Sequence, residues 1–285
     1  MRILVTGGTG KVGSALAREL LERDVEVRVL SRTPDGTGAS ADVEHVAGDM
    51  SRPETLPAAF EGANRVYLLT PLAQDEVEQG RNAVDAAHRA GVERLVFQSI
   101  FHAAEGVGIP HFESKIEILD RIRESGLPFT VVAPSSFYQN DVALRDLIVQ
   151  RGIYPNPIGS GGINRVDVRD VAGVAAAALL EPDYESREVP AVGPDTWTGE
   201  DIAEVYSRIL GREVRYPGDD LEAWAAGARN FIPEWLVHDL GLMFAHFQEE
   251  GLAASEAELA ETRAALGREP RPFDEFAREL MAGGA

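Results

Sequence analysis

The fold is decided by the first thirteen residues, which read Met1-Arg2-Ile3-Leu4-Val5-Thr6-Gly7-Gly8-Thr9-Gly10-Lys11-Val12-Gly13. A short apolar run typical of a buried strand leads directly into a glycine-rich turn, and apolar residues then recur at helical spacing. The turn can be aligned as Gly8-x-Gly10-x-x-Gly13 or as Gly7-x-x-Gly10-x-x-Gly13. In either alignment the glycines allow backbone N–H groups to approach a pyrophosphate at the start of a helix. This strand–turn–helix context predicts a dinucleotide-binding site.

The residues about 20 positions after the turn predict which dinucleotide binds, because a carboxylate there would hold the 2′-hydroxyl of NAD. This chain has Ser31-Arg32 instead, and a guanidinium can bind a 2′-phosphate through two charge-assisted hydrogen bonds. We therefore expect NADP(H) as the preferred cofactor, with NAD(H) possible. The alternative left open is that Arg32 is an ordinary surface residue of the loop that continues through Pro34.

Apolar runs and helical patterns alternate through the first half of the chain. The runs are nearly continuous, as expected for parallel strands covered on both faces, and they lie at 3–6, 25–30, 43–47, 65–70, 95–99 and 129–133. Strand–helix alternation of this kind implies right-handed βαβ crossovers. The sequence therefore predicts an α/β fold, a doubly wound (Rossmann-type) parallel sheet with a smaller, mostly helical C-terminal region.

A loop rich in proline and glycine at 156–162 separates the two parts. We expect an NADP-binding Rossmann domain over 1–155 and a C-terminal substrate or partner region over 156–285, in which 164–192 packs back onto the first domain. A short strand is predicted at 166–168. Asp170 is a candidate N-cap for the alanine-rich helix that follows it.

The composition excludes several classes of protein. The 285 residues contain no cysteine, which excludes disulfides, thiolate metal sites and cysteine nucleophiles. A formal net charge of -20 disfavours binding to nucleic acid or to anionic membranes. Because neither a signal peptide nor a membrane-spanning apolar run is visible, we expect a cytoplasmic protein. We expect no metal, since metal-ligand spacing is missing among His45, His88, His102, His238 and His246.

Lysine is rare in this chain. Of the 27 Lys and Arg residues, only Lys11 and Lys115 are lysine. A compact ammonium differs from a planar guanidinium in reach and hydration, so the positions that keep lysine are the first candidates for ligand contact. The alternative is that lysine remains at these positions by chance.

Several separate motifs resemble those of the NmrA-like family of atypical short-chain dehydrogenases/reductases, and the likeness extends over most of the chain. They are Val5-Thr6-Gly7-Gly8-Thr9-Gly10, Ser31-Arg32-x-Pro34, Gly48-Asp49, Pro110-His111-Phe112-x-Ser114-Lys115, Ser125-Gly126-Leu127, Phe137-x-x-Asn140, Val168-x-Asp170-Val171-Ala172 and Leu266-Gly267-Arg268-x-Pro270-Arg271-x-Phe273-x-x-Phe276.

The resemblance implies a set of site residues. The dinucleotide would contact the turn at Gly7, Thr9, Gly10, Lys11, Val12 and Gly13, then Ser31, Arg32, Asp49, Met50, Thr70, Pro71, Ser99 and Lys115. Members of the wider superfamily transfer a proton with a serine and a Tyr-x-x-x-Lys pair. Ser99 and Lys115 match two of these positions as candidate catalytic residues, but His111 stands where the tyrosine belongs. A substrate would contact Phe137, Tyr138 and Asn140.

His111 and Lys115 are four residues apart, which places both on one side of a helix. The spacing of the Tyr-x-x-x-Lys pair is therefore kept, while the tyrosine is replaced by a histidine. Whether His111 donates a proton or only begins a helix stays open. The leading hypothesis is an NADPH-dependent reductase that transfers hydride to a small conjugated acceptor such as a quinone. The alternative is a non-enzymatic NADP(H)-sensing regulatory protein with a protein partner, and the third is a nucleotide-sugar epimerase.

Overall fold

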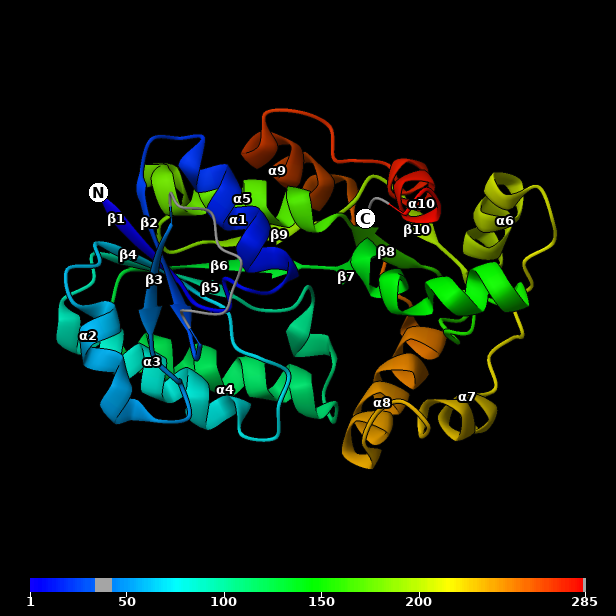
Figure 1. The fold of residues 1–285 in the computed structure, drawn as a ribbon, viewed down its shortest axis with the longest axis horizontal. Coiled ribbons are helices and arrows are strands. Elements are labelled where there is room, and N and C mark those ends of the chain that lie inside the picture. Colours follow the sequence, from blue (N-terminus) through cyan, green and yellow to red (C-terminus); the bar gives the residue numbers. More distant parts are fainter. Residues whose placement is uncertain (34–42, 284–285) are drawn as a thin grey trace.

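The computed structural model of this chain describes residues 1–33 and 43–283. Its centre is a seven-stranded sheet in the order β3-β2-β1-β4-β5-β6-β9, and all neighbouring strands in it are parallel (Figure 1). The chain moves outward from β1 in both directions, which confirms the predicted doubly wound fold. The strands are β1 (Arg2–Val5), β2 (Glu26–Ser31), β3 (Glu44–Ala47), β4 (Arg65–Leu68), β5 (Arg94–Gln98), β6 (Phe129–Pro134) and β9 (Glu188–Ala191).

Helices cover both faces of this sheet. On one face lie α1 (Lys11–Leu21) and α5 (Val168–Leu180); on the other lie α2 (Leu56–Phe60), α3 (Glu76–Ala90) and α4 (Pro110–Ser125) (Figure 1). Successive residues of β1 enter different cores, because Ile3 and Val5 pack with α1 and α5 whereas Leu4 packs with α2 and α3. Burial on both faces explains why the strand sequences are continuous apolar runs.

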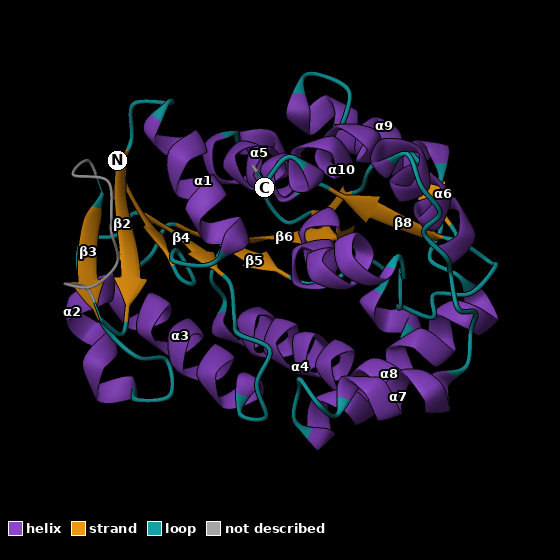
Figure 2. Ribbon diagram, turned by 45° about the vertical axis from the view of Figure 1, so that its right-hand side comes forward, coloured by secondary structure: helices purple, strands orange, loops and turns teal. Residues whose placement is uncertain are grey.

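The second lobe is smaller and mostly helical, as predicted (Figure 2). Three short strands form its sheet in the order β10-β8-β7: β7 (Ser136–Phe137), β8 (Ile163–Val166) and β10 (Thr196–Trp197). Its helices are η4 (Tyr138–Leu144), η5 (Leu147–Arg151), α6 (Gly199–Leu210), α7 (Leu221–Ala228), α8 (Glu234–Glu250) and α10 (Phe273–Met281). Within the described ranges no helix is long and apolar enough to cross a membrane.

The remaining elements connect the lobes or lie in turns. α9 (Glu256–Leu266) packs beside α5 on the first lobe, and β9 extends the large sheet beyond β6. Single-turn helices lie at η2 (Pro53–Thr55), η3 (Ala103–Glu105) and η6 (Pro182–Tyr184). The chain therefore returns to the first lobe after β8, through α5 and β9, and again through α9.

The start of α5 differs from the sequence-based expectation. Val168 is the first helical residue rather than the end of a strand, and the N-cap is Asp167, whose carboxylate accepts from the Arg169 N–H at 2.8 Å. Asp170 is fully buried, and its carboxylate accepts hydrogen bonds from Arg268 and Arg271 instead. This ion-pair cluster holds the C-terminal segment that contains Arg268 and Arg271 against α5. Two of the motifs noted in the sequence therefore contact each other.

Candidate functional site

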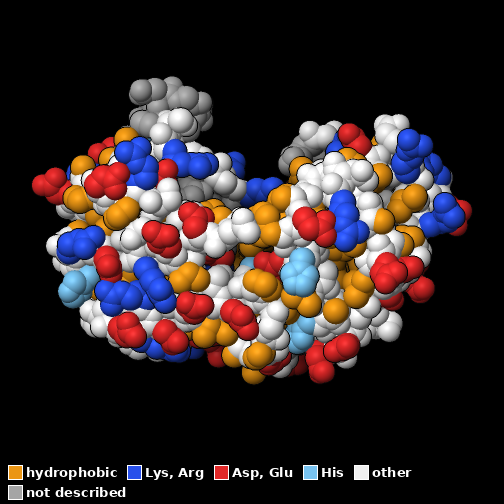
Figure 3. Space-filling model, turned by 90° about the horizontal axis from the view of Figure 1, so that it is seen from below, with side chains coloured by type: hydrophobic (Ala, Val, Ile, Leu, Met, Phe, Trp, Pro, Cys, Tyr) orange, Lys and Arg blue, Asp and Glu red, His pale blue; other side chains and the backbone are white. Residues whose placement is uncertain are grey.

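The residues predicted to bind the dinucleotide lie at one edge of the large sheet. Gly7 follows β1, Arg32 follows β2, Asp49 follows β3, Thr70 follows β4 and Ser99 follows β5. Between β1 and β4 the strand order reverses, which is the position where open α/β sheets bind ligands. The molecular surface is hollowed between the first and the second lobe (Figure 3).

The glycine turn between β1 and α1 leaves little room for side chains. Gly7 has a φ of +63°, which glycine adopts without strain. A Cβ on Gly13 would lie 2.3 Å from the Gly7 carbonyl oxygen, so glycine is required for α1 to pack this closely against the turn. A Cβ on the exposed Gly10 would meet only the Gly7 oxygen, at 3.2 Å. The turn is therefore open on the side of Gly10 and closed at Gly13.

The N-terminus of α1 is suited to an anion. By helix geometry the amides of Lys11, Val12 and Gly13 have no partner within the helix, and Gly10 supplies no side-chain cap. The first turn carries no acidic side chain that would repel an anion. Thr9 is exposed beside these amides. Because the helix dipole adds to the free N–H groups, this donor set fits a pyrophosphate.

Lys11 connects the glycine turn to the start of the second lobe. Its Nζ donates to the backbone oxygen of Gln139 at 2.6 Å. Burial lowers the pKa of the Lys11 amine, and the negative charge of Asp141 opposes this shift. The side chain of Gln139 also donates to the Asp167 carboxylate and accepts from the Val168 N–H. Lys11 therefore bridges two segments that border the predicted cofactor position.

The carboxyl ends of β2 and β3 carry the residues predicted to select the cofactor. Ser31 is buried, and its Oγ accepts from the Thr33 N–H at 3.2 Å. Arg32 is exposed and has no hydrogen bond or ion pair to the described part of the chain. Hydrogen bonds from Ser51 lower the pKa of Asp49, and the nearby charge of Arg32 lowers it further. Arg32 thus lies close enough to Asp49 for the two charges to interact, and no described residue bonds to its guanidinium.

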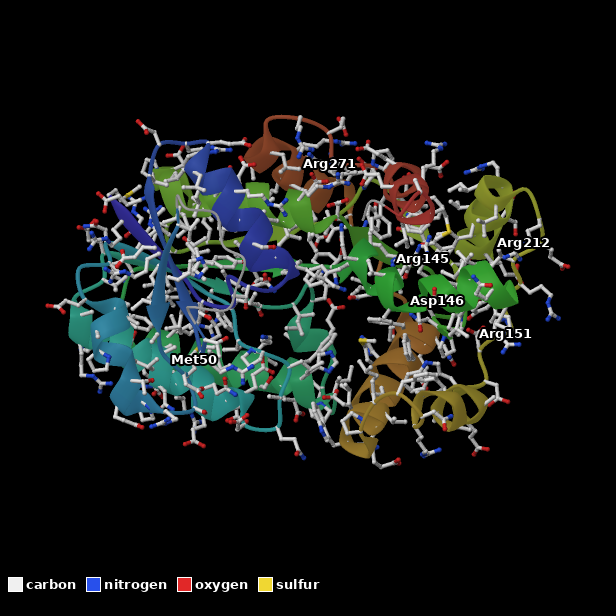
Figure 4. The ribbon with its side chains drawn as sticks, in the orientation of Figure 1. Met50, Arg145, Asp146, Arg151, Arg212 and Arg271 are labelled. Atoms are coloured by element: carbon white, nitrogen blue, oxygen red, sulfur yellow. The ribbon has the colours of Figure 1, made fainter. Side chains whose placement is uncertain are left out.

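Met50 is buried on the first lobe near α2 and α3 (Figure 4), and its carbonyl accepts from the Asn82 amide at 2.9 Å. The alternative interpretation placed Arg32 on a surface loop that continues through Pro34, and Pro34 lies outside the described residues. Three of the arginines labelled in Figure 4 belong to the second lobe and lie far from Met50 in this view: Arg145, Arg151 and Arg212. Two of them hold helix ends, since Arg145 donates to Leu280 and Arg212 to Ile148.

A buried polar cluster joins the end of β4 to α3 and α4. The Lys115 amine donates to Thr70 Oγ1 at 2.7 Å and to Glu76 Oε1 at 2.5 Å. The hydroxyls of Thr70 and Ser114 also donate to the Glu76 carboxylate, at 2.6 and 2.7 Å. The side chains of Lys115 and Glu76 are only 8% and 2% exposed. Glu76 thereby balances the lysine charge inside the protein, as a buried charge requires.

Two described residues accept hydrogen bonds from Lys115, which leaves one of its donors without a partner in that part of the chain. An ammonium carries three N–H groups, and Thr70 and Glu76 accept from two of them. The third has no acceptor among the described residues, and the ring of Phe97 lies 5.9 Å from the amine. Pro71, which follows Thr70, is exposed. This geometry fits a lysine that donates to a ligand hydroxyl while its position is fixed by the chain.

His111 lies at the start of α4 and contacts the second lobe. Its Nδ1 is 2.5 Å from Oδ1 of Asp239, a buried residue of α8. The two side chains are 10% and 5% exposed. Ser99 is buried at the end of β5, and its hydroxyl has no hydrogen bond within the described residues. His111 and Lys115 therefore lie on the same helix but bond to different carboxylates. The partner of His111 belongs to the second lobe, and the partner of Lys115 belongs to the first.

The three residues predicted to contact a substrate have different environments. Tyr138 is fully buried, its hydroxyl donates to the Arg271 carbonyl at 3.2 Å, and burial raises its pKa. Its ring packs on Phe273, with centroids 5.1 Å apart, so Tyr138 belongs to the core of the second lobe, and its assignment as a substrate contact is corrected. Phe137 is half-buried and Asn140 is exposed, and both remain candidates.

Sequence reasoning missed both carboxylates that hold the candidate residues. Glu76 lies in the first turn of α3, where acidic residues usually reflect the helix dipole, so its type carried no signal of burial. Asp239 did leave a signal, because it is the one acidic residue in the mostly apolar stretch from Trp235 to Phe247 on α8. A charged residue within a mostly apolar stretch of helix indicates a buried partner, and here that partner is His111.

Comparisons with known proteins identify a family model, similar sequences and a similar fold. The model of the NmrA-like family matches residues 1–277. An NAD(P)H azoreductase of Xenophilus azovorans is 34% identical over 98% of both chains. A (4-alkanoyl-5-oxo-2,5-dihydrofuran-3-yl)methyl phosphate reductase of Streptomyces griseus is 33% identical over 97% of both. The solved structure of Citrobacter sp. triphenylmethane reductase complexed with NADP(H) has the same fold, with a TM-score of 0.87 at 22% identity and full coverage of both chains.

The family match covers nearly the whole chain, and the motifs that suggested it are distributed from the glycine turn to the C-terminal segment on α5. The expectation drawn from those motifs is confirmed. This chain belongs to the NmrA-like family.

Proposed function

We propose that this protein is an NADPH-dependent reductase that transfers hydride from nicotinamide C4 to a small conjugated acceptor such as a quinone. The observation that carries the proposal is the open glycine turn at the uncapped N-terminus of α1, on the same sheet edge as Arg32, which has no hydrogen bond or ion pair to the described residues. Relatives that are reductases, at 34% and 33% identity, favour catalysis over binding alone.

The preference for NADP(H) over NAD(H) rests on Arg32 and Ser31. The guanidinium binds the 2′-phosphate, and the Ser31 hydroxyl, which accepts one backbone hydrogen bond, still has its own proton to donate. Neither residue carries the negative charge that would repel that phosphate. Asp49 follows the neighbouring strand, but hydrogen bonds from Ser51 occupy one of its carboxylate oxygens, and it contributes on the adenine side.

Lys115 holds the nicotinamide ribose through its third N–H donor. Thr70 and Glu76 accept from the other two donors, so the position of the ammonium is already fixed without the ligand. Such pre-organisation reduces the ordering that binding would otherwise require. Ser99 and the exposed Pro71 follow neighbouring strands of the sheet and complete this side of the cofactor position.

The acceptor is expected to be conjugated because the superfamily's tyrosine is replaced by His111. When hydride reaches a conjugated acceptor, the resulting negative charge is delocalised, so less depends on a strong protein acid than for a simple ketone. The names of the two relatives are consistent with this expectation, since one is an azoreductase and the other reduces a compound whose ring double bond is conjugated to an oxo group.

The experiment offers purified protein NADPH or NADH together with a panel of quinones, azo dyes and enones, and follows the loss of reduced cofactor. We expect turnover with at least one acceptor and faster turnover with NADPH. Gly10→Val is the control, because its side chain would block the open side of the turn without a clash in the core. NADPH binding without turnover on any acceptor would favour the NADP(H)-sensing alternative, and no NADPH binding would refute the site.

A further inference from the structure

A histidine–carboxylate pair connects the two lobes beside the Lys115 cluster. His111 is the second residue of α4, and its Nδ1 approaches Asp239 Oδ1 of α8 to 2.5 Å. The ring of Phe112 meets the His111 ring edge-on, with centroids 4.8 Å apart. Both members of the pair are almost fully buried. The orientation of the imidazole is therefore set by a residue of the second lobe and not by α4 alone.

Among the residues that the structure describes, Asp239 has no second partner that would explain its burial. Within the described residues its carboxylate bonds only to His111, whereas Glu76 of α3 accepts from three side chains. A buried carboxylate with a single partner depends strongly on that partner. The Nε2 of His111, in contrast, has no partner in the described part of the chain. Asp239 thus fixes one ring nitrogen, and no described residue bonds to the other.

We propose that Asp239 is a positioning residue that holds His111 with Nδ1–H toward the carboxylate, so that Nε2–H donates a proton to the reduced acceptor. This inference rests on the proposed reductase function. A carboxylate can only accept, which excludes the ring orientation with an unprotonated Nδ1 toward Asp239. The negative charge of Asp239 also balances the positive charge of the ring before it donates.

The proton step is balanced. Bound NADPH would supply a hydride, which is one hydrogen with two electrons, to a carbon or nitrogen of the acceptor and would be oxidised to NADP⁺, so that the conjugated oxygen or nitrogen of the acceptor becomes negative. The Nε2–H bond of His111 then breaks as an O–H or N–H bond forms on the acceptor. The ring is left neutral with Nδ1–H still bonded to Asp239, and water restores the proton at Nε2.

Two acceptors separate positioning from a structural role. The anion of a reduced quinone is already stabilised, whereas the enolate formed from an enone depends more on a proton donor. We expect Asp239→Asn to lower kcat with an enone by about 10²-fold, the lower end of what a positioned acid contributes. With a quinone we expect little change, and the KM for NADPH should stay the same with both acceptors.

Three controls accompany this measurement. Glu249→Gln removes an exposed carboxylate from the same helix and should leave both activities unchanged. In the His111→Phe background Asp239→Asn should cause no further loss, because its effect passes through the imidazole. Circular dichroism and NADPH titration show whether each variant is folded and still binds cofactor.

A readout independent of activity is the protonation of the His111 ring in the cofactor-free protein. Long-range ¹H–¹⁵N spectra resolve the six histidines, and the signals lost in His111→Phe assign this one. We expect Nδ1 to carry a proton in the parent protein. An unprotonated Nδ1, equal kcat losses with enone and quinone, a further loss in the His111→Phe background, or no loss at all would each overturn the proposal. If the parent reduces neither acceptor, the reductase function fails and the proposal fails with it.

Discussion

The buried pair of Lys115 and Glu76 allows a prediction of stability from the structure. Lys115→Met keeps the length of the side chain but removes its charge and leaves the Glu76 carboxylate, 2% exposed, with only the hydroxyls of Thr70 and Ser114. Removing one partner of a buried ion pair typically costs about 3–5 kcal/mol. We expect a loss of this size in the free energy of unfolding, measured by urea denaturation with circular dichroism.

The double variant Lys115→Met/Glu76→Gln should recover most of this loss, because a neutral amide still bonds to both hydroxyls and no charge is left buried. The matched control is Arg81→Met, which breaks an ion pair between the same two helices where both side chains are more than half exposed. Its cost should be at most about 1 kcal/mol. If Lys115→Met and Arg81→Met cost the same, or if Glu76→Gln brings no recovery, the buried-pair reasoning is refuted.

Three further predictions concern the cofactor site and the C-terminal segment. Arg32→Ala should weaken NADPH binding by roughly 10- to 150-fold, about 1.5–3 kcal/mol, and leave NADH binding unchanged in calorimetric titration, while Arg52→Ala should affect neither. Gly10→Val should abolish NADPH binding in a folded protein, whereas Gly13→Val should also disrupt folding because its Cβ clashes with the turn; a folded Gly13→Val variant would contradict this. Asp170→Asn should lower the free energy of unfolding by about 3 kcal/mol, and an unchanged urea midpoint would show that the carboxylate does not hold the C-terminal segment.

The fold could be predicted because its signals are local. Apolar runs define the strands, the glycine turn marks the start of α1, and parallel strands bring their carboxyl ends to one edge. Positions that follow such strands, such as Arg32 and Thr70, could therefore be assigned to one region before their contacts were known. The small sheet of the second lobe and the helices that follow β7 were not predicted, because their elements are short and carry weak periodicity.

The side-chain environments could not be predicted in the same way. Tyr138 and Phe137 are neighbours in a motif, but only the tertiary packing shows that Tyr138 enters the aromatic core and Phe137 does not. Asp167 and Asp170 are both acidic residues near the start of α5. Asp170 bonds to arginines that are far away in the sequence, and Asp167 is the residue that caps the helix. Lys115 was identified by its rarity, yet its partner Glu76 lies 39 residues away in sequence.

The most direct test of the central claim follows the hydrogen itself. NADPH labelled with deuterium at nicotinamide C4 is incubated with the parent protein and an enone, and the reduced product is analysed by mass spectrometry and NMR. The proposed function predicts that the carbon-bound hydrogen added at the β-carbon comes from the cofactor, so the product carries the label from one C4 face and not from the other. A reduced product that carries no label from either C4 face, or no reduction of any acceptor in the panel, would contradict the claim.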